Sequence, residues 1–101
     1  MYISRLAFHT IPGRTSEVER ELRSLRALVA AGGAQHSRVL RAHFASLGAP
    51  DLVFEQEAAD LVDLERQLKG VTENPDFQEW SKRVSSLLAQ SPKREIYLVS
   101  E

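Results

Sequence analysis

The spacing of apolar residues changes along this chain from a period of two to a helical period and back, and this order of patterns constrains the fold most strongly. Residues 1–11 alternate between apolar and polar side chains, as expected of a half-buried strand. Residues 36–46 and 51–57 alternate as well, and the connecting LGAPD is typical of a hairpin turn. The segment REIYLVS, residues 94–100, predicts a last strand.

Two helical segments separate these strands. Ser16 and Glu19 form a capping-box pattern ahead of apolar residues at helical spacing, and a Gly-Gly pair at 32–33 ends that segment. Residues 58–70, AADLVDLERQLKG, place three leucines on one helical stripe and predict a helix that stops at Gly70.

A third helix is predicted immediately afterwards. Asn74 is a favoured N-cap residue, and Pro75 suits the first helical position, where its missing N–H has no partner in any case. Trp80 lies on the apolar stripe of this helix, so we predict that it packs in the core and does not contact a substrate.

The predicted order is strand, helix, two strands, two helices and a strand, which is the α+β, ferredoxin-like βαββαβ arrangement in a single domain, residues 1–101. Its four-stranded antiparallel sheet has the expected strand order 4-1-3-2, with the helices on one face. One parity of strand positions is apolar across the sheet and is predicted to meet the helices. These positions are Leu6, Phe8, Leu40, Ala42, Phe44, Leu52, Phe54, Ile96 and Leu98.

The other parity mixes aliphatic and ionisable side chains. A face left to water has no need of the aliphatic groups, and a fully packed face could not accept so many unpaired charges. We therefore expect two such sheets to pack face to face in a homodimer, with Arg41 and His43 in the subunit interface. The positions on this face are Ile3, Arg5, Ala7, His9, Val39, Arg41, His43, Val53, Glu55, Glu57, Glu95, Tyr97 and Val99.

Composition narrows the class of protein. Charged residues make up 27% of the chain, the formal net charge is −1, and the signs are interspersed, so neither nucleic acid nor a membrane is an expected partner. The chain has no cysteine, and MYISRLAF lacks the form of a signal peptide, which predicts a soluble cytoplasmic protein. No His-x-x-x-His or His-x-Glu spacing occurs, and we expect neither a metal nor a cofactor.

Several segments resemble the NIPSNAP family and its relatives in the dimeric α/β-barrel superfamily, which also holds the antibiotic-biosynthesis monooxygenases. The resemblance covers nearly the whole chain and rests on the Pro12-Gly13 turn, the helix start NPDFQEW and the exit SLLAQSPKREI into the last strand. It implies two sheets that close into a barrel. Members range from cofactor-free monooxygenases and haem-degrading enzymes to proteins with no assigned reaction, and no catalytic residue set carries over position by position.

The candidate catalytic residues all come from the mixed sheet face, because a general base and a fixed cation in a half-dry cavity are what proton abstraction from an acidic organic substrate needs. They are His9, Arg41, His43, Glu55 and Tyr97. The alternative for the same residues is an ion-pair network that fixes the dimer.

Two hypotheses for function follow. The first is a small homodimeric barrel that binds a small organic molecule in a cavity between sheet and helices, with cofactor-independent oxygenation as its reaction. The second is a non-catalytic dimerisation or ligand-sensing module whose polar sheet face is only an interface. A closed pocket of about 300 Å³ or more, lined by the candidate residues, would favour the first.

Overall fold

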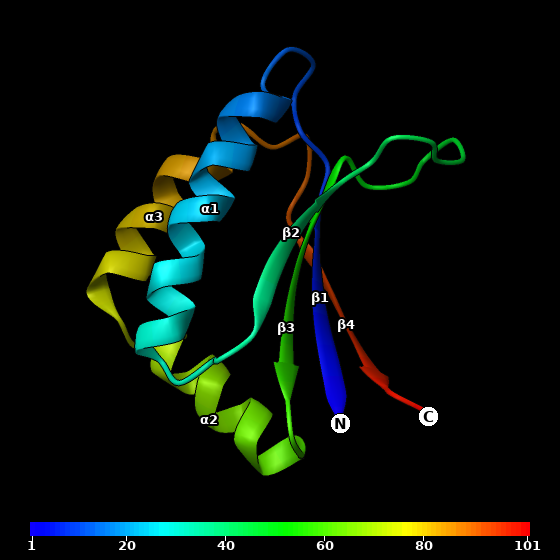
Figure 1. The fold of residues 1–101 in the computed structure, drawn as a ribbon. Helices are drawn as coiled ribbons and strands as arrows, with labels where there is room; N and C mark the ends of the chain where they lie inside the picture. Colours follow the sequence, from blue (N-terminus) through cyan, green and yellow to red (C-terminus); the bar gives the residue numbers. More distant parts are fainter.

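The computed structural model describes all 101 residues, and its elements follow the predicted order (Figure 1). They are β1 (Tyr2–Phe8), α1 (Thr15–Ala31), β2 (Ser37–Arg41), β3 (Leu52–Ala58), α2 (Leu61–Thr72), α3 (Pro75–Ser85) and β4 (Lys93–Leu98). None of the three helices has the length and apolarity that crossing a membrane requires.

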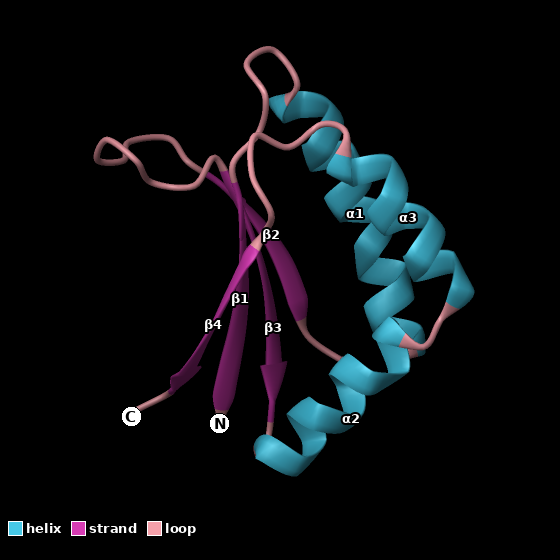
Figure 2. Cartoon of the chain, turned by 180° about the vertical axis from the view of Figure 1, so that it is seen from behind, coloured by secondary structure: helices cyan, strands magenta, loops and turns pink.

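The four strands form one antiparallel sheet in the order β2-β3-β1-β4, as predicted. All three helices lie on one side of this sheet, and the opposite side is bare (Figures 1 and 2). The predicted α+β, ferredoxin-like fold is therefore confirmed.

The core fills the layer between the sheet and the helices. On α1 the buried side chains recur at helical spacing, and on the sheet Phe8 and Phe54 meet them in the same cluster. Asn74 caps α3 through its side chain, which accepts a hydrogen bond from the backbone N–H of Asp76 at 2.9 Å, and Pro75 is the first helical residue, as predicted.

Trp80 closes the core on the α3 side. It is 5% exposed, its ring stacks on Phe77 with centroids 5.7 Å apart, and it meets Phe8 edge-on at 6.5 Å. Its indole N–H donates to the backbone carbonyl of Glu21 at 2.8 Å, which satisfies the one polar atom that burial would otherwise strand. The predicted packing role of Trp80 is confirmed.

β2 is shorter than predicted and has the opposite phase. It ends at Arg41, whereas the alternation predicted a strand to residue 46. In its register with β3, Val39 pairs with the core residue Phe54 and so faces the helices, which turns Leu40 to the bare side of the sheet. Three strand positions predicted to meet the helices are therefore wrong: Leu40, Ala42 and Phe44.

β4 is an edge strand that no helix covers. The backbones of α1 and α2 pack near β1, β2 and β3 only. Ile96 and Leu98 have the predicted parity, but they remain 48% and 62% exposed because the helical layer stops short of this strand. Their predicted burial against the helices is wrong.

Two helix ends also differ from the sequence pattern. The capping box of Ser16 and Glu19 does not form, because α1 begins at Thr15 without a side-chain cap and Glu19 accepts a hydrogen bond from Arg41 instead. α2 continues through Gly70, where its end was predicted. A Cβ at Gly70 would lie 3.1 Å from the Cα of Gly32, so this glycine permits close approach of two backbones and does not end the helix.

Replacing Trp80 by Ala should lower the free energy of unfolding by about 3–5 kcal/mol, because the change removes a buried indole and leaves a cavity between α1 and α3. Urea titration monitored by circular dichroism, at one fixed protein concentration, measures the loss. An unchanged denaturation midpoint would show that Trp80 does not support the core.

Candidate functional site

The bare side of the sheet, called the open face below, carries both apolar and charged side chains. Arginines and glutamates lie opposite one another on neighbouring strands. Arg5 lies between Glu55 on β3 and Glu95 on β4 in the register, and Arg38 lies opposite Glu55 on β2. The open face comprises Ile3, Arg5, Ala7, Arg38, Leu40, Val53, Glu55, Glu57, Lys93, Glu95 and Tyr97. Compared with the predicted face, the reversed phase of β2 exchanges Val39 and Arg41 for Arg38 and Leu40.

Glu55 is the centre of this face. It is 2% exposed, and its carboxylate lies between two arginines: Nε of Arg38 donates to Oε1 at 2.7 Å, and Nε of Arg5 is 2.5 Å from Oε2. The Arg5 contact is an ion pair without hydrogen-bond alignment, so Oε2 accepts no hydrogen bond. The hydrogen bond to Glu55 and the charge of that carboxylate raise the pKa of Arg38.

The row continues to the opposite edge of the sheet. The guanidinium of Arg5 lies over the ring of Tyr97 on β4, 5.4 Å from its centroid, a distance at which the cation is attracted to the aromatic face. Arg38, Glu55, Arg5 and Tyr97 thus link all four strands across the open face. Two of the five predicted site residues, Glu55 and Tyr97, belong to this row.

Arg41 and His43 do not point into the open face, and that prediction is wrong. Arg41 reaches over the edge of β2 to α1, where it donates to Glu19 at 2.6 Å and to the hydroxyl of Ser16 at 3.3 Å. The hydrogen bond from Arg41 is the largest of the causes that lower the pKa of Glu19. His43 follows the end of β2 in an exposed loop, with its ring edge-on to Phe44 at 4.7 Å.

His9 joins two loops at the end of β1. Its Nε2 lies 3.2 Å from the backbone carbonyl oxygen of Gly48 in the β2–β3 loop, and its Nδ1 lies 3.0 Å from the amide nitrogen of Gln90 ahead of β4. The five predicted residues therefore do not converge on one cavity. The charges of Arg41 and Glu55 are matched within the chain, which is the pattern expected of structural groups.

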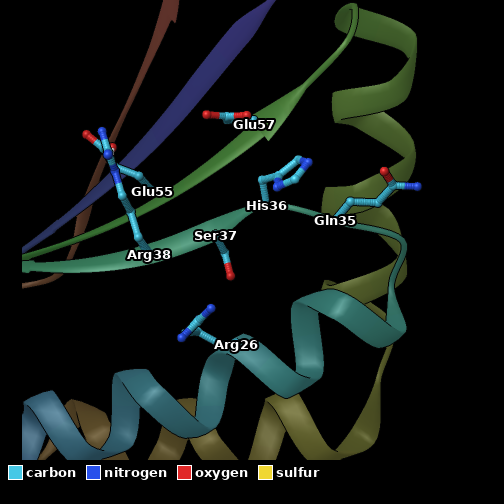
Figure 3. Close-up of a pocket in the computed structure, with 7 residues that line it drawn as sticks. All are labelled: Arg26, Gln35, His36, Ser37, Arg38, Glu55 and Glu57. Carbon is cyan, nitrogen blue, oxygen red and sulfur yellow. Dashed lines mark hydrogen bonds and ion pairs between the residues drawn. The ribbon is translucent and has the colours of Figure 1, made fainter.

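A polar groove of about 260 Å³ runs along the free edge of β2 (Figure 3). Arg38 lies beside Glu55 on the open face, whereas Ser37 points toward Arg26 of α1 on the helix side. The side chains that line the groove lie on both sides of the strand, and no apolar residue lines it. This groove therefore lacks the apolar lining typical of sites for small organic molecules.

A second space lies inside the layer between sheet and helices, and we call it the interlayer chamber. Its volume is about 30 Å³, enough for roughly one water molecule. Apolar side chains dominate its wall, and Gln56, Thr72 and Arg94 are the polar exceptions. The lining residues are Leu6, Leu25, Val29, Phe54, Gln56, Leu68, Val71, Thr72, Phe77 and Arg94.

Arg94 is the cation at the rim of this chamber. Its Nη1 donates to the buried hydroxyl of Ser4 at 2.5 Å, and none of the seven ion pairs in the chain includes it. Arg94 as a whole residue is exposed, yet the protein around its guanidinium lowers the pKa of Arg94 by desolvation. Arg94 was not a predicted site residue, although it shares its parity with Ile96 and therefore faces the helix side.

Gln56, which lines the chamber together with Arg94, begins a chain of hydrogen-bonded amides that leads to α2. Gln56 donates to Gln67 at 3.0 Å, and Gln67 donates to the backbone carbonyl of Glu57 at 3.1 Å and to Asp63 at 3.2 Å. Gln56 and Gln67 are 4% and 2% exposed, so this part of the layer is polar at a depth where most side chains are apolar.

No protein-family model matches this sequence, and no curated protein matches it. Solved structures do match over essentially the whole chain. A NIPSNAP domain protein from Burkholderia xenovorans superposes with a TM-score of 0.76 at 13% identity, covering 99% of this chain and 95% of the other. An antibiotic biosynthesis monooxygenase-like protein from Bordetella bronchiseptica gives 0.64 at 27% identity, with 99% and 98% covered.

A third solved structure, from Thermobifida fusca, is a dimeric ferredoxin-like protein of unknown function, with a TM-score of 0.68, 13% identity, and 97% and 90% of the two chains covered. The resemblance inferred from the sequence motifs thus holds at the level of the backbone. The chain has the ferredoxin-like fold of NIPSNAP and monooxygenase-like proteins.

Proposed function

We propose that the chain forms a homodimeric α/β barrel and binds a small organic molecule in the interlayer chamber, with Arg94 holding an anionic oxygen of that ligand. The position of Arg94 carries the proposal: it is a partly desolvated cation without a carboxylate partner, beside an apolar wall. Apolar pockets with a few convergent polar groups are typical of small-molecule sites, and a guanidinium binds carboxylates by charge-assisted hydrogen bonds.

Ligand binding requires the chamber to widen. Sites for small organic molecules measure about 300–1,000 Å³, roughly ten times the present space or more. The uncovered side of β4, next to Arg94, gives the access route, because no helix has to leave the sheet there. The wall of the chamber includes Phe77, which stacks on Trp80, so a ligand that displaces Phe77 changes the surroundings of the indole.

Cofactor-independent oxygenation is the catalytic form of this proposal. It needs a base that removes a proton from the substrate and a cation that stabilises the resulting anion. Arg94 supplies the cation, whereas the lining residues include no carboxylate and no imidazole. This lining supports binding without chemistry more strongly, and oxygen consumption in the presence of a bound ligand tests the catalytic form.

A non-catalytic dimerisation or ligand-sensing module is the second candidate, and the paired charges of the open face favour it. Glu55 is matched by Arg5 and Arg38, so none of these charges awaits a substrate. A buried carboxylate flanked by two arginines is also a means of fixing register between packed surfaces. Both candidates place a second copy of the chain on the open face.

Removing the two arginines should cost more stability than removing the acid they surround. The double substitution Arg5→Met/Arg38→Met strands the carboxylate of Glu55, whose side chain is 3% exposed, and should lower the free energy of unfolding by about 3–5 kcal/mol. Glu55→Gln keeps a side-chain oxygen that can accept a hydrogen bond from either arginine, and these arginines are 45% and 65% exposed in the single chain, so its loss should be smaller. Equal losses in urea titrations of the two variants would contradict a structural role for this row.

Trp80 provides the assay for the chamber, because it is the only tryptophan in the chain. We propose titrating the protein with small quinones, phenols and fatty-acid-like carboxylates while recording its fluorescence, with N-acetyltryptophanamide as the control for direct quenching. For each ligand that binds, Arg94→Met should weaken the affinity about tenfold or more, because it removes a charge-assisted hydrogen bond worth about 1.5–3 kcal/mol.

Arg20→Met is the matched control, because Arg20 is exposed on α1 and forms no ion pair. Its affinities should equal those of the wild type. The proposed ligand site is refuted if Arg94→Met binds as tightly as Arg20→Met, or if no carboxylate, phenol or quinone in the panel binds the wild type.

A further inference from the structure

The loop between β2 and β3, residues 42–50, has no role in either of the functions proposed above. Two large apolar side chains in it touch almost nothing: Phe44 is 93% exposed and Leu47 is 106% exposed, relative to a fully exposed reference. These nine residues contain no Lys, Arg, Asp or Glu, in a chain that is 27% charged. We call this loop the arm. Aromatic residues without charged neighbours are characteristic of interface centres.

The base of the arm is held in place. The backbone N–H of Ala42 donates to the carbonyl of Asp51 at 3.0 Å, and the N–H of Asp51 donates to the carbonyl of Phe8 at 3.0 Å. The contact of His9 with the carbonyl oxygen of Gly48 fixes the arm from the side. An anchored loop that displays apolar groups loses less conformational entropy on binding than a free one.

The arm projects from the end of the sheet away from the helices, on the side of the open face, and both views of the chain agree on this direction (Figures 1 and 2). A body that docks on the open face would therefore lie beside the arm. Leu40 and Tyr97 on that face are 38% and 44% exposed, so it offers apolar surface of its own.

The charges of the open face point to a second copy of this chain as that body. Three cations and three anions lie there, so two such faces carry no net charge against each other. They are Arg5, Arg38 and Lys93, and Glu55, Glu57 and Glu95. A two-fold dimer uses the same patch twice, so it would include two arms.

We propose that the arm is a clasp: in the dimer, Phe44 and Leu47 of each copy pack against the other copy beside the open faces. This inference rests on the proposed homodimer and goes beyond it, because it assigns part of the dimer affinity to two residues outside the sheet. Neither residue belongs to the core, and the only aromatic contact of Phe44 is with the ring of its loop neighbour His43, so their replacement should leave the fold of each subunit unchanged.

The double substitution Phe44→Ser/Leu47→Ser tests the clasp by sedimentation equilibrium. The dimer dissociation constant should rise by about 100-fold or more, because burying one Phe or Leu side chain is worth about tenfold in affinity at least. The matched control is Leu61→Ser/Val62→Ser, which removes two exposed apolar side chains of α2, on the helix side, and should leave the constant within about threefold of the wild type. Circular dichroism should be the same for all three proteins.

The failures of the clasp and of the dimer are distinguishable. A wild type that dimerises while the arm variant dimerises equally tightly refutes the clasp and leaves the dimer standing. A wild type that stays monomeric refutes both. If the wild type binds vesicles of phosphatidylcholine and phosphatidylglycerol, and the arm variant loses that binding with unchanged dimerisation, the arm is a lipid contact and the clasp is wrong.

Discussion

One-sided coverage of the sheet is the constraint on which the rest of the structure depends. Helices that all lie on one side bury Phe8, Leu52 and Phe54, while the opposite face keeps Leu40 and Tyr97 partly exposed. The buried charge on that face is paired within the chain, because two arginines neutralise the carboxylate of Glu55. A surface with no net charge and with exposed apolar side chains is well suited to pack against its own copy, and the proposed function and the proposed clasp both depend on it.

The same constraint separates the paired charges from Arg94. On the open face the one buried charge, that of Glu55, is paired with arginines on both neighbouring strands, whereas Arg94 lies on the helix side of an edge strand that no helix covers. Its guanidinium is therefore partly desolvated and faces an apolar chamber with only a serine hydroxyl as partner. The chain thus divides its polar groups between a set paired on the open face and Arg94, which has no carboxylate partner and to which we assign the proposed ligand.

Features that depend on local sequence patterns were predictable, whereas features that depend on contacts between residues distant in the sequence were not. The Asn74-Pro75 helix start and the buried Trp80 follow from capping preferences and periodicity, the strand order follows from the ferredoxin-like order of elements, and all three are confirmed. The phase of β2 was not predictable in this way, because Val39 and Leu40 make either phase partly apolar. It is consistent with Arg38 reaching Glu55 and Arg41 reaching Glu19, contacts across 17 and 22 positions of the sequence. Parity alone could have placed Arg94 on the helix side, but only the structure shows that no helix covers it.

Sedimentation equilibrium of the wild type and of Leu40→Asp at micromolar concentration tests the central claim most directly. Leu40 lies on the open face and outside the arm, and a carboxylate there would be buried without a partner if two faces pack together. The account predicts a wild-type mass of twice the 11.3 kDa of one chain and a monomeric Leu40→Asp variant. A monomeric wild type, or a variant that dimerises as tightly as the wild type, would contradict it.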